Sequence, residues 1–317
     1  TLNMPITGNS GYDVGKGGSS QFEFDPAADK ISVKTTFQRS SSSSVGYLDY
    51  IDINVKRQLI FDGGQLEFRN IFSSGNVARY HLQTPDKVEI WDVSQPLAPK
   101  KIKTKQVSGE LTFNTDIAPY KAFVAFDGSK YYSPVFVKEV ENQNLHAVKN
   151  IDYLIVAYPE FLSQAERLAN FHRQKDGMEV YVTTPQKIYN EFSSGAHDIT
   201  AIRDFVKHIY DRSDAGKEIK YLLLFGDASY DYKDRLPDNT NFVPCWESVN
   251  SLNTISSIAS DDYFGYLDDG EGVSSSDRVD IGIGRFPVDT PEEAKEAVDK
   301  SIDYDSNSPK TMGPWRN

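Results

Sequence analysis

The sequence predicts a chain of two parts, an antiparallel β-sandwich domain followed by a doubly wound parallel α/β domain. Apolar residues recur mostly at every second position over residues 21–140, which is the period of half-buried strands. After the polar stretch 141–150 (ENQNLHAVKN), short buried runs alternate with helical patterns, as they do in βαβ units. We therefore expect an all-β domain over residues 1–148 and an α/β domain over residues 149–317.

The first domain is expected to contain about nine strands. The alternating runs that predict them are 21–25, 30–38, 45–55, 65–72, 78–83, 88–93, 109–115, 120–127 and 131–140. The sequences Asp62-Gly63-Gly64 and Asp127-Gly128-Ser129 supply residues that adopt positive φ in tight turns. The serine run at 40–44 is interpreted as a flexible loop, with a modified or adhesive surface as the alternative.

The second domain is expected to contain four parallel strands joined by crossover helices. The predicted strands are 153–157, 178–184, a run within 219–227, and 279–284. Helical stripes cover residues 161–175, which end before Gly177, and residues 199–212. A third helix is predicted after Thr290, because Thr290 and Glu293 form a capping box and Pro291 occupies the first helical position.

The carboxyl ends of these strands are the expected functional edge of the sheet, because open α/β sheets bind ligands there. Asp227 and Arg285 directly follow predicted strands and fall on this edge. Asp227 is open to two interpretations, a functional carboxylate or one that accepts hydrogen bonds from loop amides. Ser229 lacks the G-x-S-x-G elbow of a nucleophilic serine and is interpreted as a turn residue.

Composition excludes several classes of function. Lys and Arg number 34 against 46 Asp and Glu, and the formal charge of −12 argues against a nucleic-acid partner. No apolar run approaches the roughly 18 residues of a membrane helix. The first 20 residues lack the basic and apolar regions of a signal peptide, so we expect an exported chain whose signal has been removed. One cysteine excludes an internal disulfide and a cysteine-based zinc site.

The sequence offers no convincing nucleophile and base. Cys245 is flanked by Pro244 and Trp246, and no local base or helix start would lower the pKa of its thiol, so a packed, inert cysteine is expected. The histidines fall on helices, in the β domain or just before a helix rather than on the functional edge. They are His81, His146, His172, His197 and His208.

Residues 261–280 hold the richest acidic cluster, in which Arg278 is the only local base. The seven acids are Asp261, Asp262, Asp268, Asp269, Glu271, Asp277 and Asp280. A calcium ion would suit these oxygen ligands, but the spacing of glycine fails the EF-hand pattern. A solvated acidic loop and a metal site therefore both remain open.

Four segments in order resemble the gingipain family of cysteine peptidases, and within it the sortases of type IX secretion. They are 151–195 (IDYLIVAYPEFLSQAERLANFHRQKDGMEVYVTTPQKIYNEFSSG), 221–231 (YLLLFGDASYD), 260–269 (SDDYFGYLDD) and 280–294 (DIGIGRFPVDTPEEA). The resemblance covers about residues 150–317 and implies a caspase-like α/β catalytic domain behind a β domain. It also implies a Cys–His dyad that removes C-terminal signal domains from exported cargo and, in the sortases, passes the new carboxyl end to a lipopolysaccharide anchor.

The resemblance also implies where the catalytic dyad lies. In the family the histidine and the cysteine both follow the GRFP motif, here residues 284–287, so the dyad is expected beyond Asn317. Cys245 precedes that motif and does not take the nucleophile's role. Residues 309–317 are interpreted as a linker to a further strand, and this chain alone, whether a deliberate fragment or a cleavage product, is expected to be catalytically silent.

Cofactor, partners and location follow from the same resemblance. The family binds calcium near the strand-end GD motif and the acidic loop, which makes calcium candidates of Asp227, Asp261, Asp268, Asp269 and Glu271. Expected partners are protein substrates with C-terminal signal domains, the remaining part of the catalytic domain and other secretion components. The expected location is the extracellular or outer-membrane surface of a Gram-negative bacterium. The alternative is a non-enzymatic export or adhesion module that binds a protein through its acidic edge.

Overall fold

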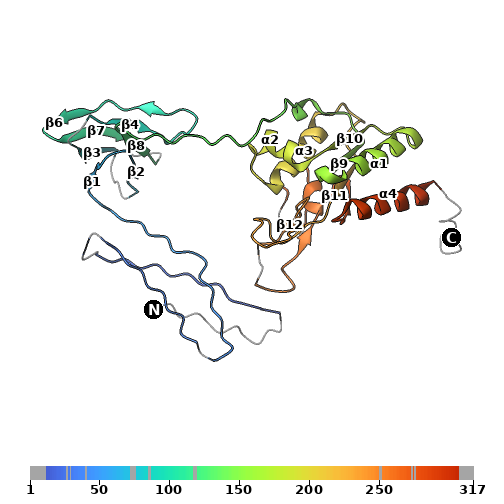
Figure 1. The fold of residues 1–317 in the computed structure, drawn as a ribbon, viewed down its shortest axis with the longest axis horizontal. Helices are drawn as coiled ribbons and strands as arrows, with labels where there is room; N and C mark the ends of the chain where they lie inside the picture. Colours follow the sequence, from blue (N-terminus) through green and yellow to red (C-terminus); the bar gives the residue numbers. More distant parts are fainter. Residues whose placement is uncertain are drawn as a thin grey trace. The chain divides into compact units, whose positions relative to one another are not determined.

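The computed structural model describes residues 12–306, apart from 26–27, 29, 40, 72–75, 85–86, 117–119, 250–251, 273 and 275. The chain divides into two units (Figure 1). A β unit spans Pro26–Glu139, and an α/β unit combines Thr1–Asp25 with Val140–Asn317. The predicted linker at 309–317 lies outside the described residues. Within the described part of the chain, no helix is both long enough and apolar enough to cross a bilayer.

The β unit contains two four-stranded sheets. One has the order β1 (Leu59–Ile60), β3 (Val77–Gln83), β7 (Glu110–Asp116) and β6 (Lys105–Val107). The other has the order β2 (Gln65–Arg69), β8 (Ala122–Phe126), β4 (Glu89–Asp92) and β5 (Lys100–Lys101). All pairs are antiparallel except β1 with β3, so the predicted antiparallel architecture is confirmed.

Side chains from both sheets share one core, which makes the unit a sandwich. Tyr80 of β3 stacks on Phe113 of β7 with ring centroids 5.0 Å apart, and Phe123 of β8 meets both rings edge-on. Leu82 and Ile90 are at most 1% exposed. Such aromatic pairs contribute about 0.5–1.5 kcal/mol each beyond the area they bury, so this cluster anchors the unit.

Four of the predicted strands do not form. Residues 21–25, 30–38, 45–55 and 131–140 run without ladder hydrogen bonds among the described residues. Nearly all of their apolar side chains are exposed, and Tyr47 is 94% and Val135 85% accessible to solvent. An alternating pattern reports which side of a strand is apolar, whereas a strand also requires a neighbour that satisfies its backbone groups. Within the serine run, Ser44 N donates to Ser41 O in a turn.

The α/β unit is built on one sheet of four parallel strands, which confirms the predicted doubly wound fold. The order is β10 (Val180–Thr183), β9 (Tyr153–Ala157), β11 (Tyr221–Phe225) and β14 (Gly282–Phe286). Helices α1 (Leu162–Lys175) and α4 (Pro291–Asp305) pack on one face, and α2 (Pro185–Phe192) and α3 (Ile199–Arg212) pack on the other (Figure 1). Both faces of β9 are buried, as the apolar run 153–157 predicted.

The helix starts follow capping chemistry. Thr290 Oγ1 accepts the Glu293 amide at 3.2 Å, and Pro291 is the first residue of α4, as predicted. Helix α2 begins in the same way, because Thr184 caps the Lys187 amide and Pro185 follows. Helix α2 was not predicted from the sequence, although its Thr-Pro start matches that of α4. Its eight residues are too few for a clear apolar stripe.

Short elements surround the sheet, and the N-terminal segment joins them. They are η1 (Leu145–Ala147), η2 (Pro159–Phe161), β12 (Trp246–Glu247), β13 (Ala259–Ser260) and η3 (Asp262–Gly265). Asp13 forms an isolated β-bridge with Asn253, whose side-chain amide donates to Asp13 Oδ1 at 2.6 Å. Val14 N also donates to Leu252 O. These contacts place residues 12–14 on the α/β unit, about 240 positions away in sequence.

Candidate functional site

The predicted functional edge forms where β11 and β14 end side by side. The Gly226 amide donates to Phe286 O at 3.0 Å, and the Asp227 amide donates to Val288 O at 3.0 Å. Gly226 has a φ of +149°, and a Cβ there would lie 3.1 Å from atoms of both Phe242 and Val243. The glycine of the GD pair therefore lets the loop at 242–243 approach the strand end closely.

Asp227 holds that loop in place. Its carbonyl oxygen accepts the amides of Phe242 and Val243 at 3.1 and 3.0 Å, and its Oδ2 accepts the Thr240 hydroxyl at 3.0 Å. The side chain is half-buried. Next to it, Ser229 Oγ accepts the Asp231 amide, as expected of a turn residue. The described contacts of Asp227 are thus those of a loop-ordering carboxylate.

Arg285 is the central residue of this edge. Its Nη1 donates to Gly226 O and Val243 O at 2.8 and 2.6 Å, and its Nη2 donates to Pro244 O. Nε and Nη2 also bind the two carboxylate oxygens of Asp261 at 2.8 and 2.7 Å. The Arg285 side chain is only 12% exposed. A bidentate pair of this kind is geometrically specific, so Arg285 ties three separate loops to the end of β14.

The five calcium candidates do not converge among the described residues. Both oxygens of Asp261 bind Arg285, whereas Asp269 is 98% exposed and pairs with Lys207 of α3 at 3.2 Å. The only group of three His, Cys or acidic side chains with ligand atoms within 4.8 Å of one another, in the described part of the chain, contains none of the five candidates. That group is His172, Asp176 and Asp305.

One candidate keeps an oxygen that a metal ion would fit. Glu271 Oε2 is buried and has no hydrogen-bond partner among the described residues, while its Oε1 accepts the Arg278 amide at 3.4 Å. Otherwise the loop is held by basic side chains of α3, which lie about 60 positions earlier in the sequence. Arg203 donates to Tyr266 O and Glu271 O, and Lys207 donates to Leu267 O. Calcium binding stays a prediction, for which Glu271 is the best candidate and Asp261 the poorest.

Cys245 lies beside this edge without a base. Burial raises the pKa of its thiol, the Arg285 guanidinium opposes that effect, and the Asp261 and Glu247 carboxylates add to it. A thiol with a raised pKa carries little thiolate near neutral pH and is a weak nucleophile. No hydrogen bond joins Cys245 to a histidine in the part of the chain that the structure describes, which includes all five histidines.

The histidines are engaged elsewhere. His81 pairs with Glu110 in the β unit, and His172 pairs with Asp176 on α1. His197 lies against the ring of Tyr189. The remaining two, His146 and His208, belong to a network around Glu191 on the α2 and α3 face of the sheet.

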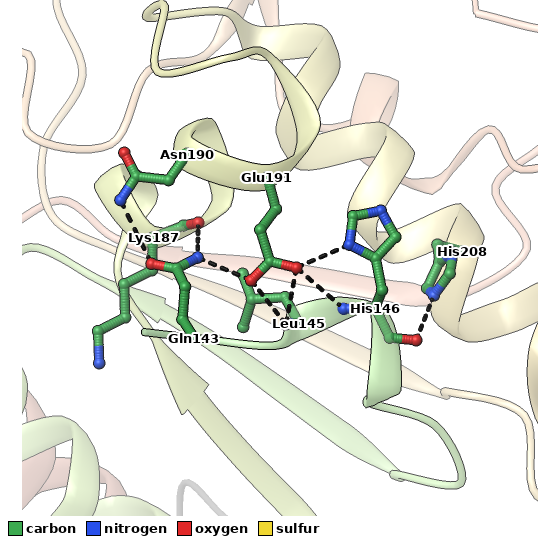
Figure 2. A network of polar contacts seen from close by, with 7 residues as sticks. All are labelled: Gln143, Leu145, His146, Lys187, Asn190, Glu191 and His208. Carbon is green, nitrogen blue, oxygen red and sulfur yellow. Dashed lines mark hydrogen bonds and ion pairs between the residues drawn. The ribbon is translucent and has the colours of Figure 1, made fainter. Parts of the chain in front are cut away.

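That network was missed by the sequence analysis (Figure 2). Glu191 at the end of α2 accepts the Leu145 amide at both carboxylate oxygens, at 2.7 and 2.9 Å, and the Gln143 side-chain amide at 2.8 Å. It also accepts the amide and Nδ1 of His146 at 3.2 and 2.7 Å. The His146 ring stacks on Phe192, and His208 Nε2 contacts His146 O at 3.0 Å.

Electrostatics shows how tightly Glu191 is held. Burial alone would raise the pKa of this carboxyl, but the hydrogen bonds from Leu145, Gln143 and His146 outweigh burial and lower the pKa to about 2. The carboxylate thereby fixes residues 143–146 to α2 at the start of the α/β unit. Its donors lie more than 40 positions away, so no local sequence signal reveals it.

Comparisons with known proteins agree on this region. The model of Peptidase family C25 matches residues 146–317, more than half of the chain. No curated protein matches the chain. Among solved structures, dimeric latent PorU from Porphyromonas gingivalis is similar at 30% sequence identity, with a TM-score of 0.70. The similarity covers 81% of this chain and 26% of that chain, so these residues span about a quarter of the length of that PorU chain.

Proposed function

Because the chain belongs to peptidase family C25, the gingipain family that four sequence motifs predicted, we propose that it is the N-terminal part of a cysteine peptidase. These residues would supply the β domain and the first part of the catalytic α/β domain. The observation that carries the proposal is the family match over residues 146–317, which includes all four strands of the parallel sheet described above. Reading the residues encoded after Asn317 tests it. A Gly-His-Gly loop followed by a strand-end cysteine supports the peptidase, and their absence favours a non-enzymatic binding module.

The substrate class proposed is exported protein cargo with C-terminal signal domains, which a sortase of type IX secretion would remove. The similarity to PorU supports this choice, because it extends beyond the C25 match into the rest of the chain. The proposed partners are the cargo, the remaining part of the catalytic domain and other secretion components, at the outer surface of a Gram-negative bacterium. Incubating the full-length protein with a cargo protein and its signal-less form tests the substrate class. Cleavage of both forms alike would refute it.

We further propose that this chain alone has no peptidase activity. The support is that Cys245 has a raised thiol pKa and no histidine partner, while Arg285 and Asp261 use their polar groups to hold loops together. A peptidyl probe that alkylates active-site thiols tests the proposal, with Cys245→Ser as the control. We expect the labelling of Cys245 to be slow and equal for probes of unrelated peptide sequence. Fast labelling that depends on the peptide would contradict it.

Calcium is proposed as a structural ion at the acidic loop. Among the candidates Asp227, Asp261, Asp268, Asp269 and Glu271, the buried and unpartnered Oε2 of Glu271 fits an oxygen-ligated cation best. A ligand that binds only the folded state raises the melting temperature. We therefore expect chelator to lower the melting temperature of the wild type and to leave that of Glu271→Gln unchanged. Equal melting temperatures of the wild type with and without calcium would contradict the proposal that a calcium ion stabilises this loop.

A further inference from the structure

Charge is distributed very unevenly between the two units. Residues 26–139 carry 15 Lys and Arg against 12 Asp and Glu, a formal charge of +3, although the whole chain carries −12. The α/β unit therefore carries −15. The β unit is therefore basic although the whole chain is acidic, and its positive charge can attract anionic partners that the rest of the chain repels.

The basic residues of the β unit gather on one short segment, which we call the lysine strip and define as residues 97–105 (LAPKKIKTK). Its lysines are Lys100, Lys101, Lys103 and Lys105, and no acidic residue occurs between 93 and 109. All four lysines are exposed. Lys101 forms an ion pair with Glu89 at 2.6 Å, and no ion pair of the other three is found among the described residues.

The fold fixes the orientation of the lysine strip. The strip contains β5 and ends at Lys105, the first residue of β6. These are edge strands of the two different sheets, so the strip runs along the open edge of the sandwich. Between them, the Ile102 amide donates to Ile90 O at 2.8 Å, and the Ile102 side chain packs against the core. This one inward anchor leaves the neighbouring lysines directed to solvent.

The same strip presents an apolar side chain on a rigid turn. Pro96 occupies the second position of a four-residue turn closed by a hydrogen bond from Ala98 N to Gln95 O at 2.9 Å. Leu97, at the third position, is 102% exposed. A leucine fully in water beside a row of lysines forms a surface in which apolar contact and positive charge act together.

We propose that the lysine strip docks the β unit on an anionic lipid surface. Anionic headgroups attract clustered lysines, and a protruding leucine gains by entering the boundary between headgroups and acyl chains. The strip contains no arginine, the residue that favours bidentate recognition of single phosphates or carboxylates. Four lysines act as point charges, which suits a surface of many headgroups better than one defined acidic partner.

The size of the effect follows from Lys100, Lys103 and Lys105, for which the described part of the chain offers no ion pair. Each lysine near an anionic bilayer strengthens binding by about five-fold, so three contribute roughly a hundred-fold at low salt. At about 0.1 M salt, this attraction is largely screened beyond a distance of about 10 Å. The net charge of the chain, −12, acts in the opposite direction, because an anionic bilayer repels it. Binding to anionic vesicles therefore requires a local concentration of positive charge, which the strip supplies.

Vesicle flotation of the 317-residue chain tests the proposal. Vesicles of phosphatidylcholine with phosphatidylglycerol are compared with vesicles of phosphatidylcholine alone, at low and at high salt. We expect the wild type to float only with the anionic vesicles and mainly at low salt. A variant with Lys100, Lys101, Lys103 and Lys105 all changed to Glu should lose this binding by at least a hundred-fold, and Leu97→Ser should lose about ten-fold.

The matched control changes the same total charge elsewhere on the β unit. It carries Glu at Lys30, Lys34, Lys130 and Lys138, which are also exposed lysines. The proposal requires this control to bind at least ten times more tightly than the strip variant, with unchanged circular dichroism for both. Equal loss in the two variants, absence of binding by the wild type, or binding to heparin or an acidic peptide but not to vesicles would each overturn it.

Discussion

Replacing Glu191 with glutamine should weaken the α/β unit in a strongly pH-dependent way. Glutamine has the shape of a protonated glutamate, so the variant measures what ionisation of this carboxyl contributes to folding. The carboxylate accepts hydrogen bonds from Leu145, His146 and Gln143, and the side chain is only 15% exposed. The glutamine amide group, a donor, would face backbone amides that are also donors, and a buried donor left without an acceptor is costly.

The magnitude follows from the pKa of Glu191. Its value falls from an ordinary 4.5 to about 2 in the folded protein. Each unit of difference between the pKa values of the folded and unfolded states corresponds to about 1.4 kcal/mol. Ionisation of Glu191 therefore contributes about 3 kcal/mol to the free energy of unfolding near neutral pH. Because the folded state has the lower pKa, this contribution is complete above pH 4.5 and disappears as the pH falls toward 2. By about pH 3, roughly half of it should remain.

Urea denaturation of wild type and Glu191→Gln, followed at several pH values, measures this difference. Hydrogen exchange of the amides of Leu145 and His146 reports whether the change is local to residues 143–146. Glu166→Gln on α1 is the matched control, because Glu166 is half-exposed and forms a surface ion pair with Arg173, which should contribute no more than about 1 kcal/mol. A loss for Glu191→Gln that is as small as that of the control, or that does not shrink between neutral pH and about pH 3, would refute the reasoning.

Substitutions at three further positions, Arg285, Phe123 and Thr290, test the architecture by urea denaturation. Arg285→Lys should cost about 3 kcal/mol, because lysine cannot replace the bidentate pair with Asp261, and a cost below about 1 kcal/mol would contradict its bridging role. Phe123→Ala should cost about 3–5 kcal/mol in the β unit, since the ring is 1% exposed, with exposed Tyr132→Ala as a near-neutral control. Thr290→Ala should cost about 1 kcal/mol and Thr290→Ser almost nothing, unless the cap is unimportant.

The parts of the fold that sequence predicted are those with a local physical cause. Helix α3 begins and ends where the apolar stripe of residues 199–212 does, and Gly177 ends the helical region after α1 with a φ of +67°. The strands of the α/β unit were found because parallel strands buried on both faces read as continuous apolar runs. Strand β14 is displaced toward the chain end of its predicted range, since the glycines at 282 and 284 blur the pattern.

The parts that sequence missed depend on partners distant in the chain. The runs at 45–55 and 131–140 are as rich in apolar residues as the strands that form, yet pairing is decided by neighbours that periodicity cannot identify. The candidate edge shows the same limit. Asp227 comes just after β11 as predicted, whereas Arg285, predicted to follow a strand, lies within β14. The pair between Arg285 and Asp261 joins residues 24 positions apart and has no local signature.

The acidic loop shows which charges a local count leaves out. Seven acids with one neighbouring arginine suggest that a cation is needed, whereas Arg203 and Lys207 reach the loop from α3 and bind its carbonyl oxygens at Tyr266, Leu267 and Glu271. Protein cations thus already order the backbone of this loop. Calcium would then add stability through Glu271 Oε2, which has no hydrogen-bond partner among the described residues, without being required for the loop to fold. It follows that Arg203→Ala should disorder the loop even in saturating calcium, a result that a metal-built loop would not give.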